Sequence, residues 1–225
     1  HPEVPGRWQY YGVSLPFWRS YDKEDPRREF FYYDYTGDAK RDDQSDYGFH
    51  YMVPEEGVTV VPNDTTKYMQ NVATMKYTYD MISDAYYDGR TICIFRLSDV
   101  ILCKAEIENN LNGPAAALPY LNQIRARAGA PEYGKHNRFP APSTKEAMND
   151  AILKERGYEL VFEFQRRADL IRFGKYEEVV NAHLKKLGIA QPTNVTSSLR
   201  YFPYPLNHAQ LNPNLAAENP SRLPK

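Results

Sequence analysis

Residues 151–176 read AILKERGYELVFEFQRRADLIRFGKY, and this stretch decides the fold because charged residues are set among apolar ones at helical spacing. The pattern predicts one long helix that extends to about Phe173. At about 100° per residue, Glu155, Glu159 and Arg166 share a face with apolar side chains. That face also carries Met148, Ile152, Phe162, Leu170 and Phe173. Because apolar residues occupy the opposite side as well, we expect the helix to be covered nearly all round and its charges to be buried.

The charged residues Glu155, Glu159 and Arg166 are interpreted as a structural ion network, because buried charges are tolerated when they are paired and hydrogen-bonded. An alternative is that Glu155 and Glu159 are the acid and base of a glycoside hydrolase, in which two carboxylates flank the scissile bond. The two glutamates lie one helical turn apart beside Arg166, which offsets their charges. The network is the favoured interpretation, and we expect no enzymatic activity.

Signals at both ends bound this helix. Residues 143–146 (STKE) follow the S/T-x-x-E pattern of a capping box, and Gly174 predicts an interruption after Phe173. From Gln191 onward the chain is rich in proline and asparagine, which argues against regular helix. The segment nevertheless carries Leu199, Tyr201, Phe202, Tyr204 and Leu206. We therefore expect residues 191–225 to form an extended tail that packs on the helices.

Upstream, residues 95–130 predict a pair of helices joined by a tight turn. From Thr91 to about Leu111, apolar residues recur at spacings of three and four. This first stripe consists of Ile94, Leu97, Val100, Ile101 and Ala105. Gly113 and Pro114 predict a stop and a restart, and the second helix has a narrow face of Ala117, Leu121, Ile124 and Ala128. The spacing partly matches a tetratricopeptide repeat, and one such pair cannot bury both of its faces.

Composition excludes several classes of protein. The formal net charge is -1, and scattered basic residues argue against a nucleic-acid partner. No apolar run approaches the roughly 18 residues that a membrane span requires. Cys93 and Cys103 are expected on different faces of one helix, as packing residues too far apart to bridge. The histidines form no metal or triad motif.

Residues 1–90 form a loop-rich segment with many aromatic residues, which we interpret as the candidate ligand-binding surface. Trp8, Tyr11, Trp18 and Tyr21 are the candidate contacts, because aromatic faces stack on sugar rings. The alternative is that the tryptophans pack beneath the loops. Runs at 57–61 and 75–80 predict short strands, and Tyr32, Tyr33 and Tyr35 predict a strand with one buried face.

An acidic loop is formed by Asp34, Asp38, Asp42, Asp43 and Asp46. Its oxygen ligands could hold Ca²⁺, but the pattern lacks the glycine and terminal glutamate of a twelve-residue calcium loop. A solvated acidic loop is the favoured interpretation, so no cofactor is expected.

The quoted helix resembles the signature of the SusD/RagB family, approximately I-x-x-E-R-x-x-E-L-x-F-E-x-x-R-x-x-D-L-x-R-x-G-K. Residues 95–131 resemble the family's last tetratricopeptide-like pair, and FPYPLNHAQLNPNLAAENP near the end resembles its closing motif. Asp25 and Arg27 resemble a short D-x-R element. Ser221 and Arg222 depart from the usual Gly-Tyr, and Glu218 stands for the common Gln.

The resemblance implies a SusD-like, mainly α fold. This fold has a helical region at 91–190 that contains a tetratricopeptide-like pair at 95–130 and a long helix. Extensive irregular loops and a few short strands complete it. It implies a lipoprotein of Bacteroidetes-like bacteria that is anchored at the outer-membrane surface through an N-terminal Cys absent from this chain. It implies capture of an oligosaccharide or polysaccharide for a SusC-like TonB-dependent transporter. The N-terminal half of the family fold is expected to be missing. Peptide or other nutrient capture, glycoside hydrolysis and a tetratricopeptide adaptor are the alternatives.

Overall fold

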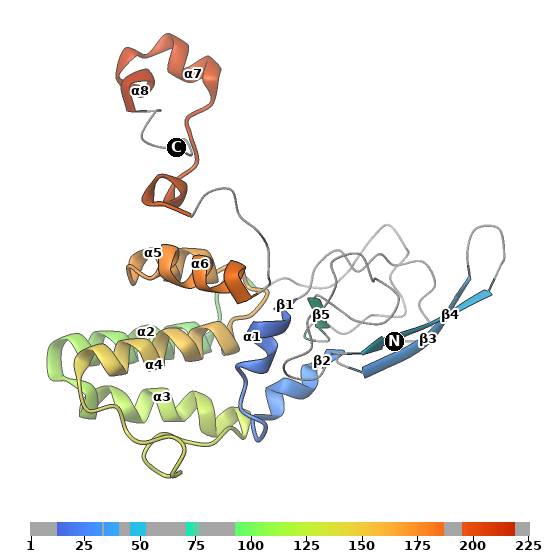
Figure 1. Cartoon of the computed structure of the whole chain (residues 1–225). Coiled ribbons are helices and arrows are strands. Elements are labelled where there is room, and N and C mark those ends of the chain that lie inside the picture. Colours follow the sequence, from blue (N-terminus) through green and yellow to red (C-terminus); the bar gives the residue numbers. More distant parts are fainter. Residues whose placement is uncertain are drawn as a thin grey trace. The chain divides into compact units, whose positions relative to one another are not determined.

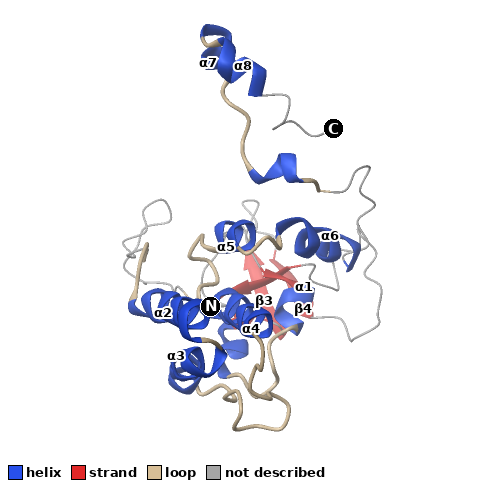
Figure 2. Ribbon diagram, turned by 90° about the vertical axis from the view of Figure 1, so that its left-hand side faces the viewer, coloured by secondary structure: helices blue, strands red, loops and turns tan. Residues whose placement is uncertain are grey.

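The computed structural model describes residues 13–32, 34–40, 46–52, 71–74, 76, 93–186 and 195–218. These residues are mainly helical, with a few short strands (Figures 1 and 2). The chain forms two compact units, His1–Met148 and Asn149–Lys225. The expected boundaries near residues 90 and 190 lie outside the described residues, so the three-segment division stays a prediction. None of the described helices is both long and apolar enough to cross a membrane.

The first unit contains the expected helix pair, α2 (Leu97–Asn112) and α3 (Pro114–Ala128), which lie side by side (Figures 1 and 2). Their shared core consists of Leu102, Ala105, Ala117, Leu121 and Ile124, all buried. Gly113 ends one helix and begins the next with φ 91° and ψ 176°. This conformation is essentially restricted to glycine. The predicted stop and restart are thus confirmed.

The first residue of α2 and the face that this helix buries both differ from the prediction. Arg96 is extended at the N-cap, so the helix begins at Leu97 rather than near Thr91. Cys93 precedes the helix and is exposed, which corrects its interpretation as a packing residue. The first part of the predicted stripe also faces solvent: Ile94 is 71%, Leu97 72% and Val100 61% exposed. The buried face instead combines Leu102 and Ala105 with polar side chains, namely Ser98, Asp99 and Asn109.

The same unit contains two small antiparallel sheets. In the first, β5 (Asn71–Thr74) lies between β1 (Val13–Ser14) and β2 (Phe31–Tyr32). The second is the hairpin of β3 (Asp34–Lys40) and β4 (Asp46–Met52), with Asp34 opposite Met52 and Lys40 opposite Asp46. Between β1 and β2 lie α1 (Leu15–Arg19) and the 3-10 helix η1 (Pro26–Phe30). The predicted strand at 57–61, and that at 75–80 apart from Lys76, lie outside the described residues.

The predicted long helix is two helices. α4 (Lys145–Glu159) ends well before Phe173, and α5 (Arg166–Arg172) follows after a turn. In that turn Phe162 and Phe164 have φ of 61° and 62°, a left-handed conformation in which a helix cannot continue. The N-cap is Thr144, whose Oγ1 accepts a hydrogen bond from Ala147 N at 3.1 Å. The capping box expected from Ser143 and Glu146 is therefore wrong by one residue.

The second unit continues through α6 (Tyr176–Lys186) and the 3-10 helix η2 (Ser197–Arg200). Two short helices, α7 (Leu206–Leu211) and α8 (Pro213–Glu218), follow. The expectation that this tail contains no regular helix is wrong, because Pro213 occupies a first helical turn, where its missing N–H costs no hydrogen bond.

Replacement of Gly113 by Ala should lower the free energy of unfolding by about 1 to 3 kcal/mol, because the backbone conformation at this junction is strained for any residue with a Cβ. A Cβ at Gly113 would meet nothing within 4 Å, so the loss would come from the backbone alone. Urea denaturation would measure it, with Gln123→Ala on the exposed side of α3 as control. Equal stability of both variants would contradict the role given to Gly113.

Candidate ligand-binding surface

The aromatic residues predicted to contact ligand fall into two groups. Trp8 and Tyr11 lie outside the described residues. Trp18 and Tyr21 are buried, with exposed fractions of 5% and 3%. The Arg28 guanidinium lies 4.1 Å from the Trp18 ring centroid, and Trp18 Nε1 donates to the Arg28 carbonyl at 3.4 Å. Ligand contact by Trp18 and Tyr21 stays a prediction, and in this structure both rings support the segment that follows them.

That segment is rigidified by a local ion pair. Arg27 donates from Nε and Nη2 to the two carboxylate oxygens of Asp25, at 3.0 and 2.7 Å, and both side chains are buried. Asp25 also caps η1 by accepting from Arg27 N. Pro26 then lies against the C-terminus of α3, where a Cβ on Gly129 would be 3.2 Å from Pro26 Cγ. The D-x-R element thus has a packing role.

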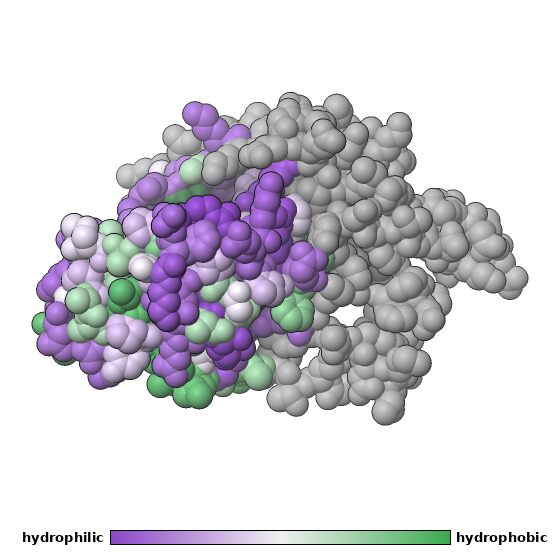
Figure 3. Space-filling view, turned by 90° about the horizontal axis from the view of Figure 1, so that it is seen from below, coloured by the Kyte–Doolittle hydropathy of each residue, from purple (hydrophilic) through white to green (hydrophobic). Residues whose placement is uncertain are grey.

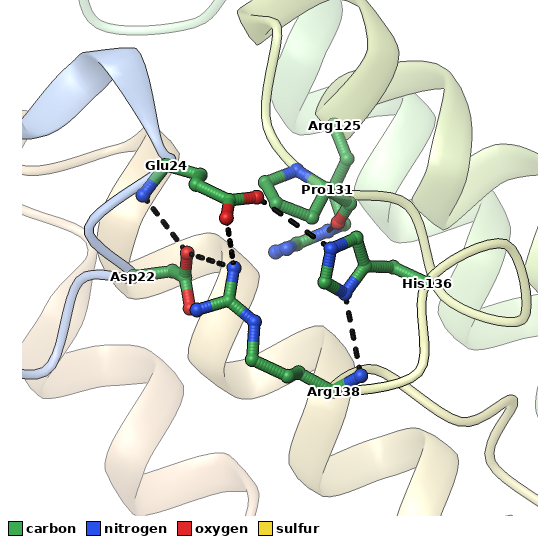
Figure 4. Close-up of polar contacts among 6 residues, drawn as sticks. All are labelled: Asp22, Glu24, Arg125, Pro131, His136 and Arg138. Carbon is green, nitrogen blue, oxygen red and sulfur yellow. Dashed lines mark hydrogen bonds and ion pairs between the residues drawn. The ribbon is translucent and has the colours of Figure 1, made fainter.

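Next to this contact, two loops bring together four polar side chains, Asp22, Glu24, His136 and Arg138, which we call the loop cluster (Figure 4). Arg138 Nη2 lies 2.7 Å from Glu24 Oε1 and 3.2 Å from Asp22 Oδ1. His136 Nε2 lies 3.5 Å from Glu24 Oε2. The Glu24 carboxylate is therefore held between a guanidinium and an imidazole.

Helix α3 fixes the loop that carries His136 and Arg138. The Asn122 side chain makes two hydrogen bonds with the backbone of Tyr133, accepting from its N and donating to its carbonyl, each at 2.9 Å. Arg125, 2% exposed, donates from Nε to the Pro131 carbonyl. Its guanidinium lies 4.8 Å from the Tyr133 ring centroid and 4.7 Å from that of Phe139. Residues 131–139 are thus clamped by two side chains of one helix.

The loop cluster has the chemical features of a site for polyhydroxylated ligands. The side chains of Arg138, Glu24 and His136 are 47%, 59% and 36% exposed, so a solute can reach them. Carboxylate acceptors and guanidinium donors can satisfy sugar hydroxyls. The half-buried Phe139 ring, 6.0 Å from the His136 ring, adds an apolar edge. Figure 3 shows hydrophilic and hydrophobic residues interleaved on one face of the described chain.

Sequence reasoning missed the loop cluster. Asp22 and Arg138 are separated by 116 positions, and no local motif links them. The signal available in the sequence was the composition of two polar loops, each beside aromatic residues.

The expected ion network is placed in a buried region. Glu155 and Glu159 are 1% and 4% exposed, so their predicted burial is confirmed. Arg166 Nη1 donates to the Leu153 carbonyl at 2.7 Å, and a mutual network of these three residues stays a prediction. The structure adds a pair that the sequence analysis did not identify, Arg156 Nε with Asp169 Oδ2 at 2.8 Å.

The aspartates considered as calcium ligands are only partly within the described residues. Asp34, Asp38 and Asp46 lie on the β3–β4 hairpin, whereas Asp42 and Asp43 are outside the described residues. Within the described ranges, no three His, Cys, Asp or Glu side chains gather as metal ligands. A bound Ca²⁺ stays untested.

Comparison with known proteins gives one consistent family. The sequence model of the SusD family matches residues 10–221. SusD-like protein P25 of Formosa agariphila is 39% identical over 120 residues, which are 53% of this chain and 22% of that protein. The starch-binding protein SusD of Bacteroides thetaiotaomicron is 27% identical over 137 residues, 60% of this chain and 22% of that protein. A crystal structure of a SusD superfamily protein from Bacteroides vulgatus aligns with TM-score 0.43 and 29% identity, covering 53% of this chain and 25% of its own. The chain thus spans about a quarter or less of the length of these relatives.

Replacement of Asp169 by Asn should lower the free energy of unfolding by about 3 to 5 kcal/mol, because it removes the charge of the carboxylate that pairs with the buried Arg156 guanidinium. Both side chains are 3% exposed. Urea denaturation would measure the loss, with Glu178→Gln as the control at an exposed carboxylate. A loss at Asp169 as small as that at Glu178 would show that the pair is dispensable.

Proposed function

The chain belongs to the SusD family, and from that premise we propose that it captures an oligosaccharide at the cell surface for import. The captured glycan is passed to a SusC-like TonB-dependent transporter, and a lipid anchor holds the complete protein at the outer membrane. No chemical step on the ligand is part of this function.

The observation that carries the proposal is the family match over residues 10–221. The match includes the helix pair, the signature helix and both loops of the loop cluster. The similarity to the starch-binding protein SusD of Bacteroides thetaiotaomicron favours a glycan over a peptide ligand. Capture of a peptide or another nutrient by the same kind of complex is the alternative.

The hydrolase alternative is less favoured by the geometry. Glu155 and Glu159 are 1% and 4% exposed, so a polysaccharide cannot reach them without unfolding of the region. In the loop cluster, both carboxylates contact the same guanidinium of Arg138. The arrangement suits binding of hydroxyl groups better than proton transfer to a glycosidic oxygen.

We also propose that α2 packs against the N-terminal half of a complete SusD-like protein. Four large apolar side chains recur along α2 at spacings of three, seven and four and remain exposed: Leu97 72%, Val100 61%, Ile107 50% and Leu111 74%. We call them the α2 stripe. In tetratricopeptide-like arrays, a helix pair buries such a face against a neighbouring pair. A tetratricopeptide adaptor would therefore need further helix pairs to cover the α2 stripe.

Affinity electrophoresis through gels that contain starch, pullulan, laminarin, xylan or alginate tests capture. The chain should be retarded by at least one polysaccharide, with no release of reducing ends on long incubation. Glu24→Gln and Arg138→Gln should weaken the affinity about 10-fold or more, because each removes a hydrogen-bonding charge. The control is Lys135→Gln on the same loop, which should bind as the wild type does.

Two results would count against these assignments. Free migration of the chain in every gel would contradict glycan capture. Retardation that is unchanged in both cluster variants would remove the loop cluster as the site while leaving capture intact.

The α2 stripe is tested by co-purification with a separate polypeptide that comprises the N-terminal part of a SusD-like relative. The wild-type chain should co-purify, and Val100→Glu combined with Ile107→Glu should abolish the association by placing charges in an apolar contact. Gln123→Glu, on the exposed side of α3, is the control. Undiminished co-purification of the double variant would exclude the stripe as the contact.

A further inference from the structure

In the second unit, the segment Val195–Phe202, here called the C-terminal strap, is tied to α5 and α6 at three points. Asn181 makes two hydrogen bonds with the backbone of Val195, at 2.8 and 2.9 Å. Arg167 Nη2 donates to the Leu199 carbonyl at 2.8 Å. Arg200 donates from Nε and Nη2 to both carboxylate oxygens of Glu177, at 2.6 and 3.0 Å. These hydrogen bonds from Arg200 also lower the pKa of the Glu177 carboxyl.

The anchored strap presents aromatic side chains to solvent. Tyr201 and Phe202 are 58% and 77% exposed, although they follow directly after the anchored Arg200. Exposure of a phenylalanine forgoes the stabilisation that burial of its ring would provide. The ring is nevertheless held in place, since the Arg167 guanidinium lies 4.9 Å from the Phe202 centroid and 5.4 Å from that of Tyr176.

Arg167 supplies polar groups beside this ring. A guanidinium has five N–H groups, and in the described part of the chain one of them donates to the Leu199 carbonyl. The side chain of Arg167 is exposed. An aromatic face next to hydrogen-bond donors matches a sugar unit, whose ring has an apolar face and a rim of hydroxyls.

We propose that Phe202 and Arg167 form a second carbohydrate-binding site, in which one sugar ring stacks on Phe202 and its hydroxyls accept hydrogen bonds from Arg167. This inference rests on the proposed glycan capture and adds a contact outside the loop cluster. Tyr201 and Phe202 are the exposed rings of the strap, and the Arg167 guanidinium lies beside Phe202. So small an aromatic surface fits one or two sugar units, whereas a stable protein interface buries about 800 Å² on each partner. A sugar is therefore the favoured occupant.

The test uses the polysaccharide that retards the wild-type chain most, in the same affinity gels. Phe202→Ala should weaken binding about 10-fold, whereas Phe202→Trp, which keeps a flat ring, should bind at least as tightly as the wild type. Arg167→Lys should also weaken binding, since it keeps the charge but loses the planar fork. Phe164→Ala is the matched control, because Phe164 is 84% exposed and belongs to the same unit.

A variant of the loop cluster distinguishes its contribution to binding from that of the Phe202–Arg167 site. Glu24→Gln combined with Arg138→Gln should keep a residual affinity that Phe202→Ala then removes. Far-ultraviolet circular dichroism confirms that each variant is folded, and a Phe202→Ala chain that is unfolded is replaced in the test by Arg167→Lys.

The possible failures are distinguishable. Wild-type affinity in the Phe202→Ala and Arg167→Lys variants would overturn the second site and leave glycan capture standing. If the Phe202→Ala variant keeps full sugar binding but no longer associates with the transporter, the ring belongs to a protein contact. That result would also overturn the second carbohydrate-binding site. Absence of any polysaccharide binding by the wild-type chain would overturn both the second site and the proposed function.

Discussion

The loop of residues 131–139 in the first unit depends on the burial of Arg125. Its guanidinium lies between two aromatic rings, and its Nε donates to the Pro131 carbonyl, so an irregular loop acquires the rigidity of the helix from which the arginine projects. Asn122, on the same helix, adds a pair of hydrogen bonds to Tyr133. A loop held in this way can place His136 and Arg138 beside Asp22 and Glu24. Without the clamp, the exposed ion pairs alone would contribute little, since such pairs are typically worth less than about 1 kcal/mol.

In the second unit, the α4–α5 turn has a comparable role. Phe162 and Phe164 adopt left-handed backbone conformations that cost free energy for residues with a Cβ. The turn brings α5 back along the chain so that Asp169 meets Arg156 at 2.8 Å. A straight helix would hold these residues thirteen positions, or about 20 Å, apart. The stretch that carries Arg156 and Asp169 therefore forms a pair of helices rather than one.

The loop cluster and the Phe202 ring, the two proposed binding sites, hold their side chains within reach of solvent in different ways. In the loop cluster, polar groups from two distant loops offset one another's charge and remain within reach of solvent. On the strap, the exposed Phe202 ring follows two anchored residues, Leu199 and Arg200. For the proposed glycan capture, both arrangements offer rigid contacts, and rigid contacts lower the entropy cost of binding a flexible ligand.

The sequence by itself determined the family, the helix pair with its junction at Gly113, and the burial of Glu155 and Glu159, because these depend on local periodicity and on residue types with few conformational options. It did not determine that Ile94, Leu97 and Val100 face solvent, since an apolar stripe does not state which partner covers it. It also predicted an uninterrupted helix through Phe162, because no glycine or proline marks the turn. The meeting of Asp22 with Arg138 was decided by the tertiary structure alone. Contacts between loops more than a hundred positions apart arise from how the chain packs, and no local pattern encodes them.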